Sequence, residues 1–174
     1  MINSMEVINH AQSCDLETAL EFENDHLIID GFMKRYNVDL EEAASILQET
    51  KKWLWIAAKA SDEEKFSLSI EKPLAVIDEM WHNFILHTRQ YHKYCMDKFK
   101  RFIHHDPTPS SEKVKFQQRV AENPTEEVKK WKDRYQQQLS YIYDHLGPET
   151  VIKWYEELPS KYTPNYLESL KKKA

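Results

Sequence analysis

One stretch of the chain concentrates the residues that can do chemistry. Between Val76 and Pro107 the sequence reads VIDEMWHNFILHTRQYHKYCMDKFKRFIHHDP, with five of the eight histidines and one of the two cysteines. Imidazole, thiolate and carboxylate groups bind transition metal ions, and a histidine paired with a carboxylate can transfer protons. The stretch therefore raises two chemical hypotheses, a metal site and an acid–base pair, against the alternative of a histidine-rich helical core.

Asp78 and His82 form the first candidate pair. They are four residues apart, so in a helix they lie on the same face and can touch. In the functional interpretation the carboxylate orients the imidazole, which then acts as a metal ligand or as a general base. In the structural interpretation a hydrogen bond between them fixes the helix beside a buried Trp81.

Further ligands depend on the path of the chain. In one straight helix, His104 and His105 would lie about 33 Å from His82, because each residue adds about 1.5 Å. If the chain instead bends at His87–Thr88, His82 faces the region of His92 and Cys95.

Two separate polar features follow from this comparison. The bent geometry predicts a zinc-like metal site with Asp78, His82 and His92 as ligands and Cys95 as a softer fourth. His104 and His105 are expected to be too distant to join it in either geometry.

A structural interpretation exists for each of these residues. Cys95 falls on an apolar stripe, where a free cysteine is commonly buried as a small hydrophobic residue. His104 and His105 point to different sides, so one is expected to contact the core while the other faces water near a helix end. The stripe has helical spacing and contains Ile77, Trp81, Phe84, Thr88, Tyr91, Cys95, Phe99 and Phe102.

The same stretch carries a family resemblance. The residues concerned are Asp78, Trp81, His82, Phe84, Ile85, Leu86, Thr88, Tyr91 and Cys95, followed by Phe102, Ile103, His104, His105 and Pro107. They resemble the central motif of the plant glycine-rich domain proteins and their small bacterial relatives. The plant motif looks like D-x-x-W-H-x-H-x-L-x-P-x-x-Y-x-x-x-C. The bacterial one looks like D-x-M-W-H-x-F-I-L-x-T-x-x-Y-x-x-x-C with a later F-I-H-H-x-P.

This sequence follows the bacterial form. Phe84 and Thr88 stand where the plant motif has histidine and proline, so a role that needs a histidine at position 84 does not carry over. The glycine-rich tail of the plant proteins has no counterpart here. The resemblance implies a helical module and implies no known reaction.

The elements that must position these residues are predicted to be helices. Only two glycines occur in 174 residues, which leaves few positions suited to tight hairpin turns. Periodicity and capping signals predict helices near 5–13, 16–36, 39–60, 111–121, 125–146, 148–158 and 163–173, with the motif region at 73–107 as one helix or a helical hairpin. Gly147 is expected to end the long helix before it. We therefore predict an all-α fold, a single orthogonal bundle of about seven to nine helices spanning residues 1–174.

The amino-acid composition indicates whether a nucleic acid or a membrane is expected as a partner. Residues 1–70 hold 6 Lys and Arg against 14 Asp and Glu, so we expect no nucleic-acid partner. No window approaches the roughly 18 apolar residues of a membrane span, and the first residues do not resemble a secretory leader. The expectation is a cytoplasmic protein with no membrane partner, whose Cys14 and Cys95 are reduced thiols.

Three functions remain open from the sequence. The preferred one is a non-enzymatic module that binds a protein partner with a basic surface, with Asp78 and His82 at its structural centre. The second is a metal-binding or metal-dependent protein, and the third is a small hydrolase or transferase with a His–Asp general base. Glycine-rich phosphate loops and the common hydrolase motifs are missing from the sequence.

Overall fold

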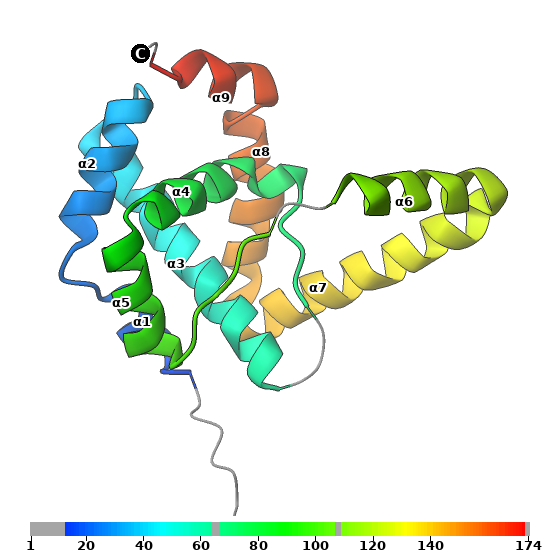
Figure 1. Cartoon of the computed structure of the whole chain (residues 1–174), viewed down its shortest axis with the longest axis horizontal. Helices are drawn as coiled ribbons and strands as arrows, with labels where there is room; N and C mark the ends of the chain where they lie inside the picture. The colour runs from blue at the N-terminus through cyan, green and yellow to red at the C-terminus, as the bar shows by residue number, and fades with distance from the viewer. Residues whose placement is uncertain (1–12, 64–66, 107–108, 173–174) are drawn as a thin grey trace, which may run out of the picture.

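The computed structural model describes residues 13–63, 67–106 and 109–172, and within these ranges the chain is helical (Figure 1). The α-helices are α1 (Leu16–Leu20), α2 (Asp25–Arg35), α3 (Leu40–Asp62), α4 (Ala75–Leu86), α5 (Thr88–Phe99), α6 (Ser110–Glu122), α7 (Pro124–Ile152), α8 (Leu158–Lys161) and α9 (Pro164–Leu170). A short 3-10 turn, η1 (Lys72–Leu74), precedes α4, and a π-helical turn, η2 (Lys153–Glu157), joins α7 to α8.

These helices confirm the predicted all-α fold. Among the described residues the extended pairing is limited to an isolated antiparallel bridge between Tyr36 and Lys171. The helix expected near 5–13 falls almost wholly outside the described ranges, as does Pro107 of the motif. No helix in the described ranges combines the length and the apolar character needed to cross a membrane.

Helix α3 is the centre of the molecule. Its first turn is capped by Asp39, whose Oδ1 accepts a hydrogen bond of 2.8 Å from the backbone nitrogen of Glu42. Helices α1, α2 and α4 pack against it, and both Trp53 and Leu54 are almost fully buried. The core therefore surrounds α3 on several sides, which explains why this helix is apolar over more than one narrow stripe.

The predicted helix at 16–36 was wrong, because the chain forms two helices there. Glu21 has extended backbone angles and ends α1, and α2 begins at Asp25. The buried ammonium group of Lys51 on α3 donates to the carbonyl oxygen of Leu20 and, at 2.6 Å, to the carboxylate of Asp25. A residue distant in the sequence thus satisfies both sides of the break, which helical periodicity cannot reveal.

The motif region is a helical hairpin. His87 leaves the helical conformation with a ψ of 61°, so the bend at His87–Thr88 separates α4 from α5. A second reversal follows at Lys100, whose φ of 57° is left-handed. The apolar stripe is buried except at Thr88, which starts α5, and at Phe102, which follows the second reversal. Those two positions were expected in the core and are exposed because the chain turns beside them.

Helix α6 and residues 124–146 of α7 form a pair of helices that we call the arm. In Figure 1 the arm extends away from the other helices. The helices of the arm pack on each other, and most of their side chains are exposed. Gly147, with a φ of 80°, interrupts the helical conformation, which confirms the predicted end of the long helix at this residue.

Candidate functional site

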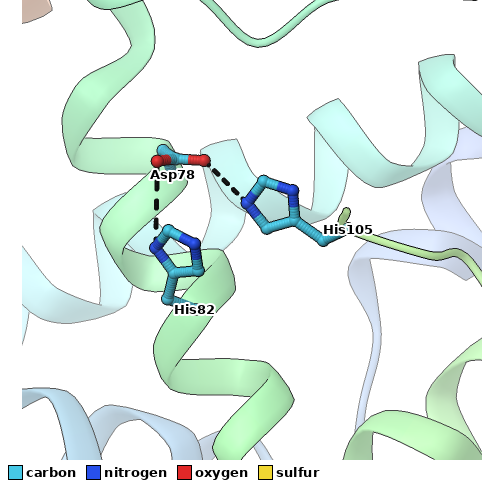
Figure 2. A group of neighbouring side chains, drawn as sticks. All are labelled: Asp78, His82 and His105. Carbon is cyan, nitrogen blue, oxygen red and sulfur yellow. Dashed lines mark hydrogen bonds and ion pairs between the residues drawn. The ribbon is translucent and has the colours of Figure 1, made fainter. Parts of the chain in front are cut away.

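Asp78, His82 and His105 come together beside α4 (Figure 2). Oδ1 of Asp78 lies 2.9 Å from Nε2 of His105, and Oδ2 of the same carboxylate lies 3.8 Å from Nδ1 of His82. One ligand atom from each residue lies within 4.8 Å of the others. A single carboxylate is therefore shared by two imidazoles from different segments of the chain.

The approach of His105 corrects the expectation that it is too distant. That expectation considered a straight helix or one bend, whereas the chain reverses twice, at His87 and at Lys100. After the second reversal, residues 101–106 run back beside α5 towards α4, as Figure 1 shows. The return of this segment brings His105 to Asp78.

A chain of hydrogen bonds holds the returning segment in place. The indole Nε1–H of Trp81 donates to the hydroxyl of Tyr91 at 2.9 Å, and that hydroxyl donates to the carbonyl oxygen of Ile103 at 2.6 Å. Trp81 and Tyr91 are buried, so these bonds have little competition from water. Two motif residues thus fix the backbone two positions before His105.

Ring stacking orients the second imidazole. The ring of His105 stacks on Trp81 with centroids 4.0 Å apart and planes 6° apart, and on His82 with centroids 4.6 Å apart. The side chain of His105 is 15% exposed, while that of His82 is 49% exposed. His105 is therefore held by the fold, and His82 is the member of the cluster that solvent or a ligand reaches most easily.

The cluster lies in the wall of a cleft of about 770 Å³. The cleft is bounded by α3, residues 67–70, α4, residues 101–106 and the first turn of α6. A general base must be within reach of a substrate, and His82 meets this condition because it is half exposed and lines the cleft. A metal ion held by the cluster would also keep coordination positions free on the cleft side.

The donor set suits a divalent transition metal ion. Two imidazole nitrogens and a carboxylate oxygen are ligands for zinc and for non-haem iron. Donors around such an ion lie roughly 3 to 3.5 Å apart, so Nδ1 of His82, which lies 3.8 Å from Oδ2 of Asp78, needs to come closer by about 0.5 Å. A side chain that is half exposed can make this adjustment by rotation.

The structure does not bring the other predicted ligands to this cluster. Cys95 is fully buried against the core, and burial raises the pKa of its thiol, which disfavours the thiolate that a metal requires. His92 is exposed on α5 and lies near Phe102, with ring centroids 6.2 Å apart. Of the predicted set of Asp78, His82, His92 and Cys95, the structure brings together Asp78 and His82 and places His105 with them.

The remaining motif residues lie outside the cluster. Phe84 is buried among the aromatic rings of Tyr91 and Tyr94, whereas Leu86 is 67% exposed at the end of α4. His104 is exposed, with its ring 5.0 Å from that of Phe102. The prediction that one of the paired histidines contacts the core and the other faces water is confirmed.

Sequence reasoning missed the approach of His105 to Asp78, for which the sequence carries only part of a signal. Residues 102–106 alternate between exposed and less exposed side chains, as an extended segment does. Ile103 and His105 share the inward side, and Phe102 and His104 share the outward one. Because an apolar residue lies two positions before each histidine, Phe102 before His104 and Ile103 before His105, the alternation by itself does not indicate which imidazole faces the molecule.

Comparison with known proteins gives one match. A family model described as UCP032817-like matches residues 16–124, a range that contains all three members of the cluster. No curated protein and no solved structure matches the chain. The matched model says nothing about glycine-rich domain proteins, so that resemblance stays a prediction.

Proposed function

The chain belongs to the UCP032817-like family, and on that premise we propose that it is a metal-binding protein. The ligands are Asp78, His82 and His105, and the ion is a divalent transition metal such as zinc. The observation that carries the proposal is the sharing of one carboxylate by two imidazoles in the wall of an open cleft. The matched part of the chain includes all three residues.

The surroundings of the ligands support this function over a purely structural contact. A hydrogen bond that only stabilises the fold needs one histidine, whereas here a second imidazole lies over the first. The ring of His105 is held on Trp81, so a ligand atom is positioned in advance and loses little freedom on binding. Two imidazoles and one carboxylate also leave positions for water or a further ligand.

Zinc titration of the metal-free protein tests the proposal. We expect one zinc ion per chain by calorimetry and elemental analysis, and a higher unfolding temperature with zinc, because an ion that binds only the folded state stabilises it. The variants Asp78→Asn, His82→Ala and His105→Ala should each weaken zinc binding by about 100-fold or more.

The neighbouring histidine provides the matched control. His104→Ala removes an exposed imidazole one residue from His105 and should leave zinc affinity within about twofold of the wild-type value. Stoichiometric binding that survives in all three ligand variants, or no binding by the wild-type protein, would refute this function.

Protein binding is a second candidate, favoured by the exposed apolar side chains of the arm. Those of Val114, Phe116, Val128 and Trp131 are between 42% and 51% exposed. Exposed apolar side chains on a projecting element are compatible with a surface that contacts another protein. The acidic first part of the chain would favour a partner that also carries a basic surface.

Affinity capture from cells that contain the protein tests the second candidate. A specific partner should be retained by the wild-type chain and lost from a variant with Phe116→Ser and Trp131→Ser. Leu40→Ser, which changes an apolar residue 64% exposed on α3, provides the control. If the wild-type protein and both variants retain the same cellular proteins in equal amounts, this result would argue against an interaction through the arm.

A further inference from the structure

A second pocket, of about 380 Å³, lies between α7 and residues 67–71. Its volume falls within the range of small-molecule sites, roughly 300 to 1,000 Å³. Asp78, His82 and His105 are not among the residues that line it. A ligand in this pocket would therefore be independent of the proposed metal-binding function.

Gln138 joins the two walls of the pocket. The residue is 5% exposed, and its Oε1 accepts a hydrogen bond of 2.8 Å from the backbone nitrogen of Ser69. Its Nε2 donates 3.0 Å to the carbonyl oxygen of Ser69 and 3.0 Å to the hydroxyl of Tyr155. A buried amide thus pairs with the extended segment as a neighbouring strand would, so the pocket is formed before a ligand arrives.

Two aromatic rings form a flat platform in the pocket. Trp131 and Tyr135 both line it and stack on each other, with centroids 5.1 Å apart and planes 18° apart. Tyr155 meets the ring of Tyr135 edge-on at 5.7 Å, while Trp131 is 42% exposed. A flat platform suits the apolar face of a ring-shaped ligand, whereas a cage for a quaternary ammonium ion needs rings on several sides.

Polar side chains beside the platform have no partner within the described part of the chain. Glu71, Arg134 and Gln137 line the pocket and form no side-chain hydrogen bond or ion pair there. The hydroxyl of Tyr135 is also without a hydrogen bond. Burial and, to a smaller extent, the charge of Glu71 raise the pKa of this phenol, so it keeps its proton at neutral pH and can donate.

The charges in the lining favour a neutral ligand. Glu71 and Arg134 have opposite charges, so their sum is zero. The other polar groups are hydroxyls and amides, which both donate and accept hydrogen bonds. A ligand with an apolar ring face and several hydroxyl groups matches both the platform and these polar groups.

We propose that this pocket binds a sugar in its pyranose form. The C–H groups on one face of the sugar ring pack on Trp131. Its hydroxyl groups donate to the carboxylate of Glu71 and accept from the guanidinium of Arg134 and the hydroxyl of Tyr135.

Ligand-observed NMR and calorimetry with the methyl pyranosides of glucose, galactose and mannose test the inference. Adenosine and tetramethylammonium serve as ligand controls, because each also binds aromatic rings. We expect at least one pyranoside to bind with one site per chain and more tightly than either control. Trp131→Ala should weaken this binding by about tenfold or more, because it removes the platform. Glu71→Ala should weaken it by about tenfold, because it removes a charged acceptor.

Tyr143→Ala is the matched protein control. It removes an aromatic side chain that is 55% exposed on α7 and does not line the pocket. Sugar affinity should stay within about twofold of the wild-type value. Thermal unfolding of the variants checks that each one is folded.

The outcomes separate this inference from the metal site. No binding of any pyranoside, tighter binding of either ligand control, or equal sugar affinity in Trp131→Ala and wild type would overturn the inference and leave zinc binding untouched. His105→Ala, which should lose zinc, should bind the sugar as the wild-type protein does. Loss of sugar binding in a folded His105→Ala variant would place the sugar at the metal cluster and overturn the assignment to this pocket.

Discussion

At the scale of single residues, the hydroxyl of Tyr91 links the core to the cluster of Asp78, His82 and His105. It accepts from Trp81 and donates to the backbone of Ile103, so it ties α4, α5 and the returning segment together. Burial raises the pKa of this phenol, which keeps the donated proton in place throughout the neutral range. The position of His105 thus depends on an atom that does not contact it.

Tyr91→Phe should loosen the cluster without removing a ligand. The substitution leaves the Trp81 donor and the Ile103 carbonyl unpaired, so we expect a loss of about 1–3 kcal/mol in unfolding free energy. Zinc affinity should fall about 10- to 100-fold, the usual effect of removing a group that orients a ligand. Urea unfolding and calorimetry measure the two quantities.

Tyr94→Phe is the control for Tyr91→Phe. Its hydroxyl donates 2.8 Å to the carbonyl oxygen of Ala19, away from the cluster. It should cost similar stability and leave zinc affinity unchanged. Equal effects of both variants on zinc affinity would mean that Tyr91 acts only through global stability.

At the scale of elements, α2 meets the α4–α5 junction at Gly31. A Cβ atom at this position would lie 2.2 Å from Nε2 of His87 and 3.2 Å from Oδ1 of Asn83. Asn83 also donates 2.9 Å to the carbonyl oxygen of Ile28 on α2. The bend that starts α5 is therefore packed directly on a helix that has no side chain at the contact.

Gly31→Ala should destabilise the protein only while His87 is present. Displacing the imidazole is expected to cost about 1–2 kcal/mol. In a His87→Ala background the same change should be neutral or stabilising by up to about 1 kcal/mol, because alanine favours helix more than glycine does. Urea unfolding of the four chains gives the coupling energy, and additive effects would contradict the close contact.

At the scale of the whole molecule, Glu49 joins α3 to the C-terminal helices. The carboxylate is 3% exposed, accepts 2.7 Å from Trp154 Nε1, and pairs with Lys153 at 2.8 Å and Lys52 at 3.0 Å. Burial by itself raises the pKa of Glu49, but the two ammonium groups and the indole outweigh it, so the pKa lies below its ordinary value of 4.5.

Because the pKa of Glu49 is lowered in the folded state, the stability of the fold depends on pH. The charged carboxylate stabilises the fold at neutral pH, and this contribution is lost as the pH falls below 4.5 through the lower pKa of the folded state. Glu49→Gln should reduce stability at pH 7 by about 2 kcal/mol. It should also show a smaller further loss between pH 5 and pH 3 than the wild-type protein.

Urea unfolding at pH 7, 5, 4 and 3, in metal-free buffer, measures this effect. Glu41→Gln, an exposed change on the same helix, should follow the wild-type curve within about 0.5 kcal/mol. A Glu49→Gln curve parallel to wild type below pH 5 would rule out a stabilising charge at Glu49.

The sequence predicted the helices better than it predicted the contacts between distant segments of the chain. Helical periodicity and Gly147 were sufficient for α3, α6 and the long part of α7, because these depend on local signals. The break between α1 and α2 depends on Lys51, which lies 26 residues beyond Asp25. His105 reaches Asp78 only because of the left-handed turn at Lys100, a residue type that gives no warning of a positive φ.

The short distance in sequence between the cluster and the arm has a mechanical consequence. His105 lies five residues before Ser110, where α6 begins, so one side of the arm is joined to the core through the segment that carries His105. An ion held by Asp78 and His105 would clamp that segment to α4. The ion would then restrain one of the two connections between the arm and the rest of the protein, while the other runs through α7, where Gln138 bonds the backbone of Ser69.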